Sequence, residues 1–214
     1  MATRTVTRKK NLVSKATQLA RKRLGGDAGA ACADFVSAYY ANVPPVDIAE
    51  MDAETLFASA ESFLRFAQKR LPGEPLIRVF NPRQDDHGWN GSHTVVEIAT
   101  EDMPFLVDSV TAELNYQGLT VHLVIHPIFQ VTRTAAGTMK NCAGTPADGA
   151  RAESFMHFEV NELTDPKTLA NLTGRLEQVL QDVGASVQDW QSMQGKVAGI
   201  LEDLDTQPKK IAKA

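Results

Sequence analysis

The stretch EDMPFLVDSVTAELNYQGLTVHLVIHP (residues 101–127) changes its hydrophobic period partway along. An acid–Met–Pro turn opens it, and residues 104–117 then follow a helical pattern. Gly118 can end that helix, because glycine adopts the left-handed conformation of a helix C-terminus at little cost. From residue 119 to residue 133 the apolar residues alternate, as in a strand with one buried face. The stretch therefore predicts a helix followed by one long strand.

Two more strands and a second helix surround this unit. Residues 93–99 (HTVVEIA) and 153–161 (ESFMHFEVN) alternate apolar and polar side chains, which indicates strands. The next helix has Asp165 as its N-cap and Pro166 at its first position, and we expect it to end at Gly184. A separate last helix is expected after that glycine.

The predicted order from residue 93 onward is strand, helix, strand, strand, helix, which is most of a ferredoxin-like split βαβ unit. Residues 76–80 (LIRVF) can supply the fourth strand, beside residues 93–99. We therefore predict an α+β fold, an antiparallel sheet with two helices on one face. The expected organisation is a helical N-terminal segment (1–73), the α+β domain (74–184) and a C-terminal helix and tail (185–214).

The composition is that of an ordinary globular protein, with 214 residues of which 43% are hydrophobic and 22% charged. No apolar run approaches the roughly 18–20 residues that a membrane-spanning helix needs. Two cysteines, Cys32 and Cys142, lie far apart without a partner pattern. This usage favours plain thiols in a reducing compartment, and we expect a cytoplasmic location.

The N-terminus is basic and has no acidic residue before Asp27. Such a segment is compatible with a transit peptide or a nucleic-acid arm. The alternative is a solvated helix, in which Leu12, Ala16, Leu19 and Ala20 form one weak apolar stripe. No aromatic residue interleaves the basic ones to stack on bases, so we favour the solvated helix and expect no nucleic-acid partner.

Alternation gives the predicted sheet one apolar face and one polar face. The apolar face, expected against the two helices, takes Val96, Ile98, Val121, Leu123, Ile125, Met156, Phe158 and Val160. The polar face takes His93, Glu97, His122, His126, His157 and Glu159. Such clusters suit divalent metals, but His122 and His126 are four residues apart on a strand, about 13 Å, too far to share one ion. We expect no metal, and a polar face that is open or covered by another domain.

The sequence carries no recognised motif of hydrolytic or nucleotide chemistry. It has no Gly-x-Ser-x-Gly elbow, no His-Glu-x-x-His and no phosphate-cradling Gly-x-x-x-x-Gly-Lys, and no Gly-x-Gly-x-x-Gly follows a strand. We therefore expect no catalytic residue in this chain.

The remaining candidate is a ligand-binding turn formed by Asp102, Met103, Pro104 and Phe105. It leads from a strand end into a helix N-terminus, where free backbone N–H groups and the helix dipole favour an anion such as a carboxylate. Asp102 can instead cap the helix itself, with Pro104 in the first turn. The cap needs no ligand and is the simpler interpretation.

Three segments in fixed order resemble a known family: EDMPFLVDSVTAELNYQGLTVHLVIHPIFQVTR, ESFMHFEV, and a Leu-rich helix leading to VQDWQSM. They are similar to the N-terminal region of the large bacterial NAD-specific glutamate dehydrogenases, over residues 76–204. The resemblance implies an ACT-like domain placed far ahead of a catalytic domain. It also implies that the parent reaction, oxidative deamination of L-glutamate to 2-oxoglutarate with NAD reduction, is carried out elsewhere.

The wider ACT group binds amino acids at its first strand-to-helix turn, often with an Asp-x-Pro-Gly-Leu pattern. Asp102, Pro104 and Leu106 match, whereas Phe105 stands where the pattern has glycine. Glycine lets a ligand approach the backbone closely, and phenylalanine fills that space. Two expectations stay open, an amino-acid effector site at this turn and a purely structural or oligomer-forming module.

The resemblance thus predicts the regulatory or assembly domain of an NAD-dependent glutamate dehydrogenase, as a fragment or a truncated product. No cofactor is expected in this chain, since NAD would belong to the parent enzyme's catalytic domain. The expected partners are downstream domains or other subunits of the same enzyme in a homo-oligomer, with no membrane partner. The alternative is a stand-alone ACT-like interaction or amino-acid-sensing module without catalytic activity.

Overall fold

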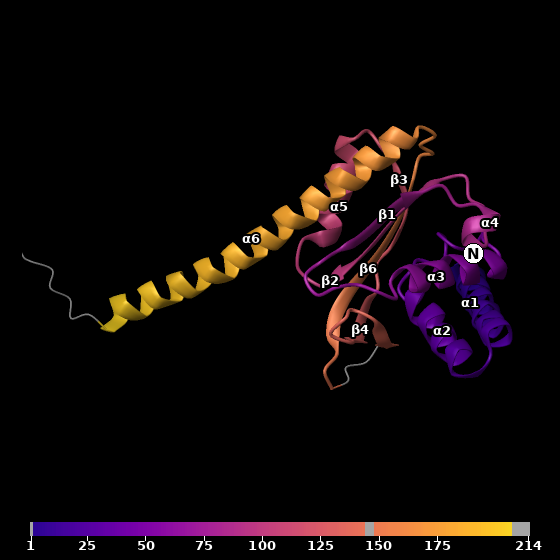
Figure 1. Cartoon of the computed structure of the whole chain (residues 1–214), viewed down its shortest axis with the longest axis horizontal. Coiled ribbons are helices and arrows are strands. Elements are labelled where there is room, and N and C mark those ends of the chain that lie inside the picture. Colours follow the sequence, from indigo (N-terminus) through magenta and orange to yellow (C-terminus); the bar gives the residue numbers. More distant parts are fainter. Residues whose placement is uncertain (1, 144–147, 207–214) are drawn as a thin grey trace, which may run out of the picture.

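The computed structural model of the chain describes residues 2–143 and 148–206. Within these residues a six-stranded antiparallel sheet lies between two groups of helices (Figure 1), which confirms the predicted α+β class. The strands are β1 (Leu76–Phe80), β2 (Thr94–Glu101), β3 (Val121–Ile125), β4 (Ile128–Arg133), β5 (Met139–Ala143) and β6 (Arg151–Val160).

β6 is the central strand of the sheet. β2 pairs along one edge of β6, and β3 and β4 pair one after the other along its opposite edge. β1 lies outside β2, with Leu76 opposite Ala99 and Phe80 opposite Val95, so the predicted fourth strand is confirmed. β5, which the sequence pattern did not indicate, extends the sheet beyond β4. The order is that of a split βαβ unit with one additional edge strand.

The single strand expected over residues 119–133 is wrong, because His126 and Pro127 interrupt it. Proline has no N–H to donate to a sheet ladder, and the Pro127 carbonyl instead accepts the Phe155 N–H at 3.0 Å. A bulge between Val121 and Leu123 also shifts the register against β6. As a result Leu123 and Ile125 lie on the face opposite to the predicted one.

One face of the sheet carries α5 (Leu106–Tyr116) and α6 (Pro166–Thr206). The predicted apolar residues of β2 and β6 lie in this core, together with residues of both helices. Its buried members are Val96, Ile98, Leu106, Val110, Leu114, Met156, Phe158, Val160, Leu172, Leu176, Leu180 and Val183. Asp165 accepts the N–H groups of Lys167 and Thr168, as expected of an N-cap.

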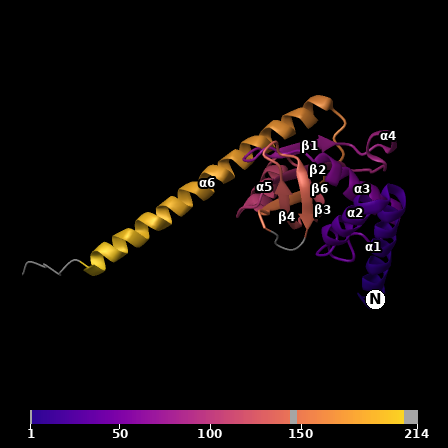
Figure 2. The same ribbon diagram turned by 60° about the horizontal axis from the view of Figure 1, so that its bottom comes forward.

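α6 does not end at Gly184, and the expectation of two helices is wrong. The helix runs unbroken for 41 residues, and Gly184 is not among the glycines with positive φ. A glycine inside a helix costs only about 1 kcal/mol relative to alanine, which the helical residues on both sides outweigh. Beyond Val187 the helix projects away from the sheet (Figures 1 and 2).

Replacing Gly184 with alanine tests this continuity. A Cβ at this position meets no heavy atom within 4 Å, so we expect Gly184→Ala to stabilise the helix by about 0.5–1 kcal/mol. Far-UV circular dichroism during urea unfolding measures the change. A loss of stability would indicate a left-handed glycine at a helix end, which alanine tolerates poorly.

The opposite face of the sheet is covered by the N-terminal helices α1 (Ala2–Leu24), α2 (Gly26–Tyr39) and α3 (Ala53–Phe66), and a short α4 (Gln84–His87) follows β1. Phe35, Tyr39 and Phe63 of these helices lie in one core with Phe129 and Phe155 of the sheet. The polar sheet face is therefore covered by the chain's own helical segment. The predicted domain boundary at residue 73 stays a prediction. The predicted boundary at residue 184 lies inside α6, which continues without a break to Thr206.

α1 packs as the predicted solvated helix with a single apolar stripe. Ala16 and Ala20 are fully buried, and Leu12 and Leu19 are partly buried against the same core. The Lys9 ammonium donates to the carbonyls of Ala41 and Val43, which anchors the helix to the end of α2.

The two cysteines are free thiols, as predicted. Burial raises the pKa of Cys32 to about 11 and that of Cys142 to about 12, with smaller contributions from neighbouring carboxylates, so both are protonated at neutral pH. No helix in the described part of the chain is long and apolar enough to cross a membrane.

Candidate functional site

The predicted ligand-binding turn joins β2 to α5. Phe105 is the N-cap residue of α5, with φ of 73°, and among the described residues it is the only non-glycine with positive φ. An L-residue in this region costs roughly 1–2 kcal/mol, which glycine avoids. The Phe105 side chain is 60% exposed. The turn therefore keeps the backbone shape that the glycine of the Asp-x-Pro-Gly-Leu pattern favours, with its aromatic ring at the surface.

Asp102 does not cap α5, so the capping interpretation is wrong. Its carboxylate accepts the Ser154 hydroxyl proton at 2.5 Å, and its backbone N–H donates to the Ala152 carbonyl at 3.0 Å. Both bonds tether the turn to β6. The N-cap residue is Phe105, whose side chain cannot accept a hydrogen bond. The first N–H groups of α5 are thus left for solvent or an anion.

His126 joins this turn from the end of β3. Its Nε2 lies 3.1 Å from the Ser154 hydroxyl oxygen. Because Ser154 gives its single proton to Asp102, the imidazole must donate from Nε2. Burial lowers the pKa of His126, and the Asp102 carboxylate only partly opposes this, so the ring is neutral at pH 7. Ser154 is fully buried, and the network positions the turn rather than presenting a nucleophile.

The other three polar-face histidines lie away from the turn. His157 and Glu97 are directly opposite on β6 and β2, and the imidazole Nδ1 is 3.1 Å from a Glu97 carboxylate oxygen. Arg78 of β1 donates to the second Glu97 oxygen at 2.6 Å. His93 Nδ1 lies 3.2 Å from Glu159, and its ring stacks on His122 at 4.5 Å between centroids.

The buried part of this cluster, His157 with Glu97 and Glu159, is an ion-pair network under the helices, whereas His93 is 36% exposed. Burial alone lowers the pKa of His157, but hydrogen bonds to Glu159 and Glu97 outweigh it and raise the pKa to about 9. Burial likewise raises the pKa of Glu159, and bonding to His157 outweighs it, so that pKa lies below its usual value. The described residues contain no group of three or more His, Cys, Asp or Glu that could hold a metal.

The network makes stability depend on alkaline pH. A histidine whose folded pKa is raised from 6.5 to about 9 stabilises fully below pH 6.5, and that contribution is lost as pH rises through 9. We expect the free energy of unfolding to fall by on the order of 1–3 kcal/mol between pH 6 and 9.5. Urea titrations at both pH values measure it. In His157→Gln the free energy of unfolding should change little between pH 6 and 9.5. If the variant loses as much stability as the wild type, the pH dependence arises from groups other than His157.

Sequence reasoning missed Ser154, since a serine inside a strand pattern carries no signal of its own. It also grouped His126 with the other histidines on one face, whereas the structure brings only His126 to Asp102. The sequence placed Glu97 and His157 on one face, and the strand register confirms that placement.

A split βαβ sheet with α5 and α6 on one face defines an ACT-like α+β domain. The family model described as "Glutamate dehydrogenase, ACT1 domain" matches residues 35–176. The chain belongs to this family, as the N-terminal ACT1 region of an NAD-specific glutamate dehydrogenase.

Similar proteins include the NAD-specific glutamate dehydrogenase of Halomonas elongata, which is 33% identical over 94% of this chain and 13% of the relative. The Pseudomonas aeruginosa protein of the same name is 28% identical over 83% of this chain and 11% of the relative. That of Mycobacterium tuberculosis is 30% identical over 56% of this chain and 7% of the relative. The chain therefore spans a small part of the length of these relatives.

Proposed function

We propose that this chain is a regulatory and assembly module of an NAD-dependent glutamate dehydrogenase, with no chemistry of its own. The observation that carries the proposal is the ACT1 family match over the residues that form the two-sided sheet. The parent reaction, oxidation of L-glutamate to 2-oxoglutarate, and its NAD site belong to other domains of the enzyme. Those domains and other subunits of a cytoplasmic homo-oligomer are the proposed partners.

We further propose that the turn of Asp102, Met103, Pro104 and Phe105 receives an amino-acid effector. The N-terminus of α5, uncapped by Phe105, suits the effector's carboxylate. The exposed Asp102, held in place by Ser154, suits its ammonium group. The two ends of the turn thus match the opposite charges of a free amino acid.

Calorimetry with a panel of amino acids tests the effector site. Heat with at least one amino acid, abolished by Asp102→Asn, is the expected result. The matched control is Asp47→Asn, which removes the same charge from an exposed position in the segment between α2 and α3. The absence of heat with every amino acid would overturn the effector site and leave the assembly role.

An assay of the purified chain with glutamate and NAD tests the absence of chemistry. We expect no formation of NADH, because no described cluster offers a free acid, base and nucleotide site together. Measurable turnover that follows the chain through purification would contradict the proposal.

A further inference from the structure

The distal part of α6 carries an apolar stripe that the other described residues do not cover. The side chains are between 52% and 67% exposed. Five of the six follow one another at spacings of three and four residues, and Leu201 lies four residues after Val197 on the same side; this is the pattern with which one helix packs along another. We call them the distal stripe: Trp190, Met193, Val197, Ile200, Leu201 and Leu204.

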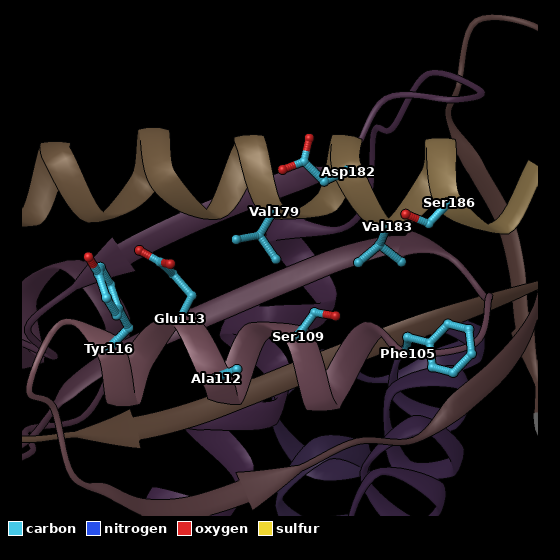
Figure 3. Close-up of a pocket in the computed structure, with 9 residues that line it drawn as sticks. All are labelled: Phe105, Ser109, Ala112, Glu113, Tyr116, Val179, Asp182, Val183 and Ser186. Carbon is cyan, nitrogen blue, oxygen red and sulfur yellow. The ribbon is translucent and has the colours of Figure 1, made fainter. Parts of the chain in front are cut away.

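Nearer the sheet, the same face of α6 borders a groove shared with α5. The groove has a volume of about 560 Å³, and Phe105 and Tyr116 of α5 stand at its two ends (Figure 3). These two side chains are 60% and 80% exposed. On the α6 side Val179, Asp182 and Val183 line it. A groove with two helical, largely apolar walls suits an amphipathic helix that inserts residues at i, i+3, i+4 and i+7.

We propose that a second copy of this chain fills the groove, so that the distal stripe of each copy lies antiparallel in the α5–α6 groove of the other. Val183 in the groove and Val197 in the stripe are fourteen residues apart on one helix, about 21 Å. A two-fold axis that passes between the two α6 helices, level with Trp190, brings Val183 of one copy opposite Val197 of the other. One symmetry operation then fills both grooves and covers both stripes, which is a closed, isologous dimer.

The described residues of one copy leave this surface exposed. The α6 wall of the groove and the distal stripe belong to one unbroken helix, whose distal part extends away from the sheet (Figures 1 and 2). A parallel pairing of two stripes would leave both grooves empty, whereas the antiparallel arrangement covers Phe105 and Tyr116 as well.

The charges agree with the antiparallel arrangement. Lys196 is the single basic residue of the sequence between residues 185 and 206. With the axis near Trp190, Lys196 comes beside the partner's Asp182 at the groove wall, and symmetry makes this pair twice. Within one copy, Lys196 and Asp182 are fourteen residues apart on the same helix, about 21 Å, and cannot pair.

Sedimentation analysis of the whole chain tests the dimer, and the expected mass is twice 23.3 kDa. Val197→Glu with Ile200→Glu, which puts charges into the buried stripe, should weaken the dimer at least ~100-fold. The control adds the same charges on the opposite side of the helix, as Gln188→Glu with Ser192→Glu, and should remain dimeric. Circular dichroism checks that every variant is folded.

Ala112→Arg in the groove wall should also give a monomer. If it stays dimeric while the stripe variant does not, the stripes pair with each other and the groove model is wrong. Mixing the two monomeric variants should restore a heterodimer, because the intact stripe of one fits the intact groove of the other. Failure of the folded variants to associate overturns the reciprocal arrangement.

Exchanging the two charges tests the register. Lys196→Asp and Asp182→Lys should each weaken the dimer, and the double variant should recover it, which only contacts between copies can do.

A monomeric wild-type chain would overturn the inference. The inference rests on the assembly part of the proposed function, and a monomer that still binds an amino acid would leave the effector site intact.

Discussion

Glu153→Gln is expected to lower the free energy of unfolding by about 3–5 kcal/mol. The Glu153 carboxylate binds two arginines, Arg70 at 2.8 and 3.2 Å and Arg133 at 2.7 and 2.8 Å. The Arg70 and Glu153 side chains are each 2% exposed. Glutamine of the same shape would leave two guanidinium groups out of water without a negative charge, and an unpaired buried charge is strongly destabilising.

The Glu153 cluster also joins distant parts of the chain. Arg70 follows α3, Arg133 ends β4, and Glu153 lies in β6; Arg133 in addition donates to the carbonyls of Ala67 and Gly137. Burial raises the pKa of Glu153, but both arginines outweigh it and lower the pKa below its usual value. Since the folded pKa is lowered, this stabilisation is present above the ordinary carboxylate pKa of 4.5 and is lost in acid.

Urea unfolding at neutral pH measures the effect, with Glu101→Gln as the matched control. Glu101 pairs with Arg151 at 3.7 Å on the same sheet, but the Arg151 side chain is 73% exposed and that of Glu101 37%. Its loss should cost less than about 1 kcal/mol. A Glu153→Gln protein no less stable than the control would show that the two arginines find other partners.

Phe155→Ala is expected to cost about 3–5 kcal/mol and to loosen the N-terminal helices. The ring is fully buried on the face of β6 opposite to α5 and α6. It lies 5.8 Å from Phe35 of α2, 5.2 Å from Phe63 of α3 and 5.1 Å from Phe129 of β4, measured between ring centroids. Removing the Phe155 ring therefore opens a cavity in the core that the N-terminal helices share with the sheet.

Phe158→Ala is the matched control, because Phe158 is equally buried on the same strand but faces α5 and α6. Both variants should be destabilised to a similar extent. Hydrogen exchange should rise mainly in α2 and α3 for Phe155→Ala, and mainly in α5 and α6 for Phe158→Ala. Unchanged exchange of α2 and α3 in Phe155→Ala would show that residues 1–73 form a separate domain, as the sequence division suggests.

The sequence alone was sufficient for features that adjacent residues determine. Val96, Ile98, Met156 and Phe158 were assigned to the correct face, because side chains in a regular strand alternate whatever the partner strand is. The N-cap at Asp165 was also correct, since its bonds reach only two and three residues along the chain. The same holds for the helical N-terminal segment and for the order in which β1, β2, α5, β6 and α6 follow one another.

Only the tertiary structure decided the features that depend on distant partners. The bulge that turns Leu123 to the other face arises from pairing with β6. The Asp102 carboxylate could accept a hydrogen bond either from the nearby N-terminus of α5 or from the distant Ser154 hydroxyl. In the structure it accepts from Ser154. The sequence pattern also could not predict that the N-terminal helices cover the polar face of the sheet. Local periodicity reports the secondary structure of a segment, whereas the choice of a buried hydrogen-bond or packing partner is a competition across the whole chain, settled only when the elements meet.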